Sequence, residues 1–156
     1  MINYTMKIDD LDKKILDFLQ KDGRIAASHI ADELNISIPT VTERIKKLSE
    51  NGVIQGFHAA LDPKLLGLDV SALITVISES SEHYKGVIHS AMNTPEVVQC
   101  FSTTGKGSHT IIVVAKNSQA LEELLRKIQG WPGVSRTETQ VILSSYAKNH
   151  NAYAIT

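Results

Sequence analysis

The first fifty residues contain three stretches in which apolar residues recur every three or four positions. In chain order these stripes are Leu11, Ile15, Phe18 and Leu19; Ile30, Ala31 and Leu34; and Val41, Ile45 and Leu48. Such spacing places each stripe on one face of a helix, and it predicts helices over 9–21, 27–34 and 37–51. Two short helices joined by a tight turn, with a third helix before them, are typical of a helix-turn-helix domain.

Polar residues mark where these helices begin. Asp9 stands at the capping position of the first helix, and Asp10 and Asp12 follow in its first turn, where the helix dipole favours negative charge. Ser37 is placed to cap the third helix, and Asn35 suits a left-handed turn just before it. The pattern therefore predicts the turn between the second and third helices as well as the helices themselves.

The third predicted helix has a polar face opposite its apolar stripe. This face carries Thr40, Thr42, Glu43, Arg44, Lys46 and Lys47. A helix that enters the major groove with its N-terminal end leading needs short hydrogen-bonding groups there and cations further along. A helix that binds protein would instead expose apolar anchors. The pattern indicates DNA as the partner.

The rest of the chain changes to strand patterns separated by two amphipathic helices. Residues 53–61 have strand character, and residues 62–69 form a turn-rich joint. After the joint, the pattern predicts strands over 70–78, 95–103, 109–115 and 134–145 and helices over 81–93 and 118–129. The order β-α-β-β-α-β after the joint predicts a ferredoxin-like domain, one antiparallel sheet with both helices on one face. We expect an α+β protein with a three-helix helix-turn-helix domain (1–52), a connecting strand and linker (53–68) and a ferredoxin-like domain (69–156).

The second face of this sheet needs a cover. Apolar residues alternate along the predicted strands, so they cannot all point at the two helices. Examples are Val70, Ala72, Ile112 and Val114. A homodimer formed through the open sheet faces is the economical solution.

Charge also argues for several copies acting together. Residues 1–56 carry eight Lys/Arg against nine Asp/Glu, so this region has the same formal charge of −1 as the whole chain. A single module would bind DNA weakly, because neutralised phosphates supply most non-specific affinity. Arg44, Lys46 and Lys47 nevertheless gather on the third helix, whereas five of the acids lie in the first helix and its flanks. We therefore expect several modules to bind together.

Composition places the chain among globular proteins. Its 156 residues are 42% hydrophobic, which is ample for a packed core. No apolar run approaches the roughly 20 residues that span a bilayer, and the N-terminus lacks the order of a signal peptide. The single cysteine, Cys100, excludes an internal disulfide framework. We expect a cytoplasmic protein with no membrane contact.

No pattern in the sequence indicates catalysis, a cofactor or a metal. The segment T-T-G-K-G-S lacks the phosphate-loop spacing, since Cys100 stands five residues before Gly105 and a glycine follows Lys106. The six histidines are dispersed, with no helical i, i+4 pair. Cys100 reads as a small buried hydrophobe, and Trp131 as a packing or assembly contact. We expect no enzyme activity, no cofactor and no metal site.

Five separated segments stand in one order along the chain. They are I-D-D-L-D-K-K-I-L, Q-K-D-G-R, L-N-I-S-I-P-T-V-T-E-R-I-K-K-L, G-V-I-Q-G-F and W-P-G-V. In these motifs and their spacing the chain resembles the Lrp/AsnC family, the feast/famine transcription regulators, over essentially its whole length. The resemblance implies a RAM-type ligand domain and homodimers that assemble into octamers or open arrays. It also implies that they wrap or bend double-stranded DNA and regulate genes often concerned with amino-acid metabolism.

The resemblance places the DNA-reading helix of the family on Ser37 to Asn51. The positions that it assigns to DNA are Ser37, Pro39, Thr40, Thr42, Glu43, Arg44 and Lys47. Arg44 and Lys47 are expected to meet phosphate or guanine edges, and the two threonines phosphate or thymine methyl groups. Each has a structural alternative: Ser37 and Pro39 shape the helix start, and Glu43 lies four residues before Lys47, at ion-pair spacing.

The loop between the second and third strands of the ferredoxin-like domain departs from the family pattern. Members that sense amino acids commonly carry Gly-Asp-Tyr/Phe-Asp there, and an Asp holds the ammonium group of the ligand. Here the loop reads Gly105, Lys106, Gly107 and Ser108, so a cation replaces an acid. Three interpretations stay open: an anionic effector bound by Lys106 and loop N–H groups, no effector, or a tight hairpin only.

Two functions therefore compete. The first is a DNA-binding transcription regulator that acts as a dimer-based oligomer, modulated by a small molecule such as an amino acid. The alternative is a ferredoxin-like small-molecule sensor or enzyme subunit whose N-terminal helices mediate protein contacts. The cationic face of residues 40–47 favours the first.

Overall fold

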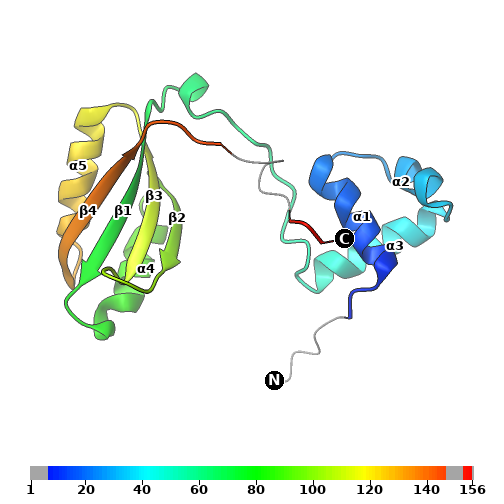
Figure 1. Cartoon of the computed structure of the whole chain (residues 1–156), viewed down its shortest axis with the longest axis horizontal. Coiled ribbons are helices and arrows are strands. Elements are labelled where there is room, and N and C mark those ends of the chain that lie inside the picture. Colours follow the sequence, from blue (N-terminus) through cyan, green and yellow to red (C-terminus); the bar gives the residue numbers. More distant parts are fainter. Residues whose placement is uncertain (1–6, 147–152, 156) are drawn as a thin grey trace. The chain divides into compact units, whose positions relative to one another are not determined.

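The computed structural model describes residues 7–146 and 153–155, and the chain forms two compact units (Figure 1). The first unit takes in Met1–Ala60 and Tyr146–Thr156, and the second takes in Leu61–Ser145. Tyr146 and residues 153–155, which the sequence pattern groups with the sheet domain, thus fall in the helical unit.

Three helices form the first unit, as predicted: α1 (Asp10–Lys21), α2 (Ala27–Leu34) and α3 (Ile38–Glu50). Their shared core consists of the fully buried residues Ile15, Ile30, Ala31 and Val41. Each of the three predicted apolar stripes contributes to this core. The stripes thus hold the three helices together around one small interior.

Side-chain caps fix where α1 and α3 begin. Oδ1 of Asp9 accepts a hydrogen bond from the N–H of Asp12 at 2.8 Å, and Oδ2 of Asp12 accepts one from the N–H of Asp9 at 3.1 Å. This reciprocal pair is a capping box. Ser37 Oγ accepts from the N–H of Thr40 at 3.2 Å, and Asn35 turns the chain with φ of 53°. The predicted caps and the predicted left-handed turn are confirmed.

The predicted strand over residues 53–61 is wrong. The structure describes all of these residues and assigns none of them to a strand. The N–H groups of Val53 and Ile54 both donate to the carbonyl of Leu48, at 2.9 and 3.1 Å, so the segment begins as the end of α3. A strand needs a neighbouring strand as well as a suitable sequence. The one sheet among the described residues consists of strands of the second unit, so residues 53–61 have no strand to pair with.

The second unit has the predicted β-α-β-β-α-β order. Its elements are a 3₁₀ turn η1 (Lys64–Leu66), β1 (Val70–Ser78), a 3₁₀ turn η2 (Ser81–His83), α4 (Tyr84–Met92), β2 (Val97–Ser102), β3 (His109–Ala115), α5 (Ser118–Gln129) and β4 (Val134–Ile142). The strands form one sheet in the order β2-β3-β1-β4, and all three pairings are antiparallel. The ferredoxin-like α+β fold is confirmed.

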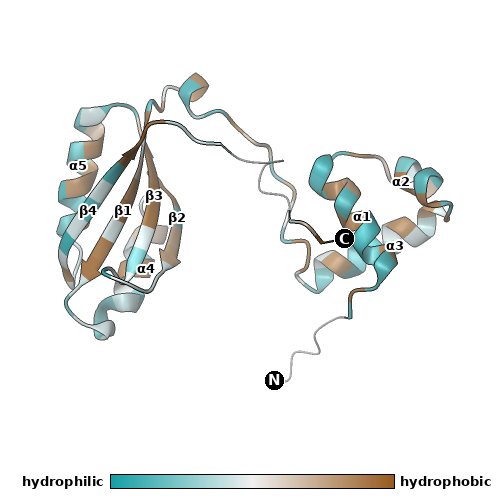
Figure 2. Ribbon diagram, viewed as in Figure 1, coloured by the Kyte–Doolittle hydropathy of each residue, from teal (hydrophilic) through white to brown (hydrophobic). Residues whose placement is uncertain are grey.

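One face of this sheet carries both helices. Burial alternates along β1 and β3, and the buried residues of these two strands form one core with Val87 and Ala91 of α4 and with Leu121, Leu124 and Ile128 of α5. Figure 2 shows the hydrophobic colour concentrated on β1 and β3. Val70 and Ala72 belong to the helix side, whereas Ile112 and Val114 alternate with the buried residues of β3 and lie on the other face.

Helix α4 is shorter than predicted. Residues 81–83 form a 3₁₀ turn, and only Val87 and Ala91 of the predicted apolar side are buried. Tyr84 and Ile88 are about two-fifths exposed, at 40% and 39%. The Tyr84 and His109 rings contact each other in a T-shaped arrangement, with centroids 5.2 Å apart.

His109 is a histidine buried inside the sheet unit. Its side chain is fully buried, and its Nδ1 pairs with Ser108 Oγ at 2.8 Å. Its Nε2 has no hydrogen-bond partner among the described residues. Burial lowers the pKa of His109 because the charged imidazolium would lose its water there.

This lowered pKa predicts that the sheet unit loses stability in mild acid. Between the folded pKa and the unfolded value of about 6.5, the unfolded chain binds the proton more readily, so the free energy of unfolding falls as pH falls through that window. Urea unfolding followed by Trp131 fluorescence from about pH 8 to about pH 5 measures the effect. His109→Gln should flatten this dependence and the exposed His89→Gln should not. Equal pH dependence in both variants contradicts the prediction.

Candidate nucleic-acid interface

The exposed side of α3 is opposite the side that it buries. Val41 and Leu48 are fully buried, whereas the predicted DNA-contacting residues lie around the rest of the helix surface. Ser37, Pro39, Thr42, Glu43 and Lys47 are exposed, and Thr40 and Arg44 are half-buried. We call these seven residues the α3 face. The helix brings all of them together on its first three turns.

Hydroxyl groups at the start of the α3 face are already hydrogen-bonded. The hydroxyls of Ser37 and Thr40 lie 2.7 Å apart, and Thr42 Oγ1 donates to the carbonyl of Ile38 at 3.0 Å. Each hydroxyl oxygen keeps acceptor capacity, and the methyl group of Thr42 stays free for apolar contact.

An ion pair occupies the middle of the α3 face. Lys47 Nζ lies 2.8 Å from Glu43 Oε1, and both side chains are more than half exposed. The hydrogen bond from Lys47 lowers the pKa of Glu43, so this carboxyl stays charged at neutral pH. Exposed i, i+4 pairs are weak, so a phosphate can replace one partner of this pair. The alternative expected for Glu43, pairing with Lys47, is therefore present in the structure.

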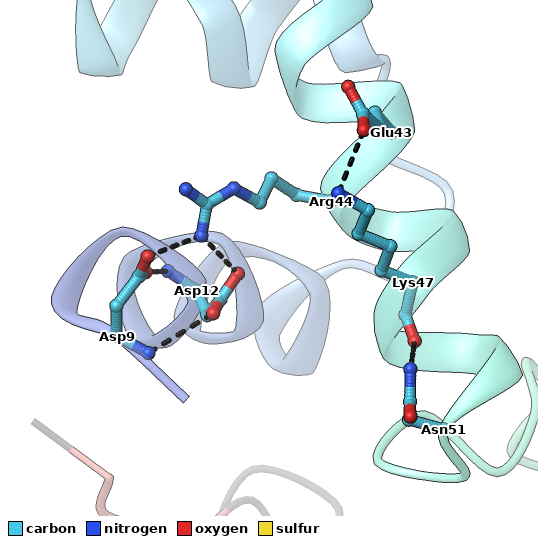
Figure 3. A network of polar contacts seen from close by, with 6 residues as sticks. All are labelled: Asp9, Asp12, Glu43, Arg44, Lys47 and Asn51. Atoms are coloured by element: carbon cyan, nitrogen blue, oxygen red, sulfur yellow. Dashed lines mark hydrogen bonds and ion pairs between the residues drawn. The ribbon is translucent and has the colours of Figure 1, made fainter. Parts of the chain in front are cut away.

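Arg44 points away from the solvent and towards α1 (Figure 3). Its Nη1 donates to Asp9 Oδ2 and, at 3.0 Å, to Asp12 Oδ1. The Asp12 side chain is only 1% exposed and that of Arg44 is 31% exposed. The hydrogen bonds from Arg44 lower the pKa of Asp9, and those to the two aspartates raise the pKa of Arg44.

These contacts join the middle of α3 to the first turn of α1. One carboxylate of Asp12 accepts both from the N–H of Asp9 and from the guanidinium of Arg44. Sequence reasoning treated Asp12 only as an acid that complements the helix dipole. The signal that could have found the contact is periodicity: Asp12 lies three residues before Ile15, and Arg44 three after Val41, so each residue borders a buried stripe.

The loop between β2 and β3 is a tight connection packed against β1. Gly107 is buried, and a Cβ there would lie 2.3 Å from Thr75 Cγ2 and 2.9 Å from the carbonyl oxygen of Val76. Ser108 Oγ lies 2.7 Å from Ser78 Oγ, and the N–H of Ser108 donates to the carbonyl of Val76 at 3.0 Å. Gly105 has φ of 104°, and both it and Lys106 are exposed. The two glycines thus have a structural role in this hairpin.

The remaining candidate residues have ordinary surroundings. Cys100 packs half-buried against the sheet core, and burial raises the pKa of its thiol, which lowers its thiolate fraction. Trp131 is buried in the same core, as a packing contact. Across residues 7–146 and 153–155, no three His, Cys, Asp or Glu side chains gather as metal ligands. In that part of the chain no helix has the length and apolar character to cross a membrane.

We predict that Arg44→Ala destabilises the helical unit while leaving the sheet unit intact. Removing the guanidinium leaves the buried carboxylate of Asp12 with backbone partners only, at a cost of about 1–3 kcal/mol. Far-UV circular dichroism reports the helices of both units, whereas the single tryptophan, Trp131, reports the sheet unit alone. The part of the dichroism transition that belongs to α1, α2 and α3 should move to lower urea, and the Trp131 transition should stay in place. Lys46→Ala, a change at an exposed position on the same helix, is the control and should leave both transitions in place. If the transitions of Arg44→Ala also stay at the wild-type urea concentrations, the prediction is contradicted.

Comparison with known proteins agrees with the geometry of both units. Residues 8–55 match the family model of a winged helix-turn-helix DNA-binding domain, and residues 69–152 match that of the Lrp/AsnC ligand binding domain. The chain is 35% identical to the HTH-type transcriptional regulator FL11 of Pyrococcus furiosus over 87% of this chain and 89% of that protein.

Solved structures are similar over nearly the whole chain. The structure of AsnC from E. coli superposes with a TM-score of 0.84 at 31% identity, covering 91% of this chain and 96% of that one. A feast or famine regulatory protein from M. tuberculosis, complexed with L-methionine, superposes with a TM-score of 0.87 at 27% identity, covering 94% and 99%. With both domain models matched and the fold shared from end to end, the chain belongs to the Lrp/AsnC family of transcription regulators.

Proposed function

We propose that the chain regulates transcription by laying the α3 face in the major groove of double-stranded DNA. The observation that supports this most is the arrangement of α3 itself: one side is buried by Val41 and Leu48, and the other presents hydroxyls, a carboxylate and cations to solvent. Thr40 and Thr42 contact phosphate or thymine methyl groups, and Ser37 and Pro39 place the N-terminal end of the helix close to the backbone.

In this proposal Lys47 exchanges its partner when DNA binds. The pair with Glu43 is exposed, so a phosphate can take the ammonium group, and the released carboxylate can accept a hydrogen bond from cytosine N4. Arg44 acts mainly as the anchor of the helix. Among the described residues its hydrogen bonds run through Nη1 alone, so its other N–H groups remain able to reach a phosphate.

The proposal includes assembly of several copies. The near-neutral first unit gives one module little attraction for phosphate. The sheet face opposite α4 and α5 carries Leu73, Ile77, Ile112 and Val114, all partly exposed in the single chain. A homodimer formed through this face, and assembled further into an octamer or similar particle, would present several α3 faces in register and could bend the DNA.

A small-molecule effector is the second part of the proposal. The chain has the ligand binding domain of its family, and one structural relative is a complex with L-methionine. In the loop of Gly105 to Ser108 the exposed cation of Lys106 would repel an ammonium group and attract an anionic one. An organic anion is therefore the effector class that this loop favours. We propose a regulator and not an enzyme, since the relatives named above are regulatory proteins.

Lys47→Ala tests the use of the α3 face directly. We expect weaker binding to all DNA sequences and a salt dependence, log K against log salt, that is shallower by about one phosphate contact per module. Band shifts at several salt concentrations, with DNA from upstream of the chain's own gene, measure both quantities. Lys127→Ala, on the exposed side of α5, is the control. Unchanged affinity and slope for Lys47→Ala would show that α3 is not the reading helix, and a wild-type chain that binds no DNA would favour the protein-contact alternative.

A further inference from the structure

Residues 153–155 contact α1 of the first unit, although α1 is far away from them in the sequence. Gln20 Nε2 donates to the carbonyl of Tyr153 at 3.1 Å, and the N–H of Tyr153 donates to Gln20 Oε1 at 2.6 Å. In Figure 1 this segment is the red end of the chain beside α1. One side-chain amide thus pairs with both backbone groups of a single residue. Such a two-point contact fixes the direction in which the segment runs, which apolar contact alone does not do.

An open groove lies beside the segment. It is lined by Leu16, Leu19 and Gln20 of α1 and by Val53–Phe57, and it leaves about 450 Å³ free with the segment in place. Tyr153 and Ile155 line the same groove. Ile155 is half-buried there, whereas the Tyr153 side chain is 79% exposed. Ile155 thus forms part of the groove wall, while most of the Tyr153 side chain is exposed to solvent.

The contact between Gln20 and Tyr153 lies close to the place where the chain leaves the helical unit. The chain leaves the helical unit through residues 53–60, builds the sheet unit through Ile142, and returns to the helical unit before its end. The groove is formed in part by Val53–Phe57, the segment through which the chain leaves. The returning end therefore hydrogen-bonds to the helix that carries Asp12, a partner of Arg44, and it borders the same groove as the departing segment.

We propose that the groove between α1 and Val53–Phe57 is a peptide-binding site whose ligand is the C-terminal segment Tyr153–Ile155 of the same chain. Gln20 recognises the peptide backbone, and the apolar walls take the isoleucine. The docked segment is a strap that holds the departing segment against α1. This role is separate from DNA contact by the α3 face, and it makes the chain's own end a part of the DNA-binding unit.

Hydrogen–deuterium exchange of the full chain tests the strap. In Gln20→Ala, the Tyr153 N–H and peptides covering 16–20 and 53–57 should exchange faster by about ten-fold, because two hydrogen bonds and the apolar closure they position are lost. Peptides from β1 and β3 should not change. Lys21→Ala, at the exposed end of the same helix, is the matched control. Gln20→Glu should lie between, since its carboxylate can accept from the Tyr153 N–H but cannot donate to the carbonyl.

A truncated chain provides the second arm of the test. Deleting residues 153–156 should give the same local acceleration, and adding a synthetic peptide of residues 147–156 should restore protection. The proposal is overturned if both Gln20→Ala and the deletion exchange like the wild type. It is also overturned if the protection in the wild type falls on dilution by about a hundred-fold, because a second copy would then supply the segment.

Discussion

The buried carboxylate of Asp12 is the constraint on which the helical unit depends. A charged group that is 1% exposed must find hydrogen-bond partners within the protein, because its hydration is lost. Asp12 finds them in the backbone of Asp9 and in the guanidinium of Arg44. The first partner fixes the start of α1 and the second fixes the middle of α3. One carboxylate therefore sets two helices relative to each other.

The α3 face derives its orientation from this contact. The cap at Ser37 sets where α3 begins, Asn35 sets the turn before it, and Arg44 sets its rotation about its own axis. A helix that rotates about its axis turns all of its side chains together, so loss of this third restraint would let the whole α3 face turn relative to α1. In the proposed function, Arg44 thus serves DNA binding chiefly by positioning the residues around it.

Local signals in the sequence predicted most of the fold. The limits of α2, β1, β3 and α5 agree with their predicted ranges because apolar periodicity, caps and turn residues are properties of neighbouring positions. The strand over 53–61 was wrong because pairing requires a second strand, which periodicity does not supply. Tyr84 and Ile88 share an apolar side with Val87 and Ala91 in the sequence pattern, but only Val87 and Ala91 are buried, because periodicity does not set how wide the buried side of a helix is.

In the candidate site, too, local features were predicted and contacts between distant residues were not. The sequence predicted which residues share the α3 face, since helical spacing alone decides that. It did not predict that Arg44 turns inward, because its partners Asp9 and Asp12 lie 35 and 32 positions away in the chain. The contact between Gln20 and Tyr153, separated by 133 positions, was likewise beyond any local pattern.

The most direct test is a double-mutant cycle between Asp12 and Arg44 in the full chain. Asp12→Asn keeps the shape and the capping oxygen, and Arg44→Met keeps the length of the side chain without its charge. The unfolding free energy of the helical unit, followed by far-UV circular dichroism in urea, gives the coupling between them. The account predicts a favourable coupling of about 1–3 kcal/mol. Single changes that add to within about 0.5 kcal/mol would contradict it.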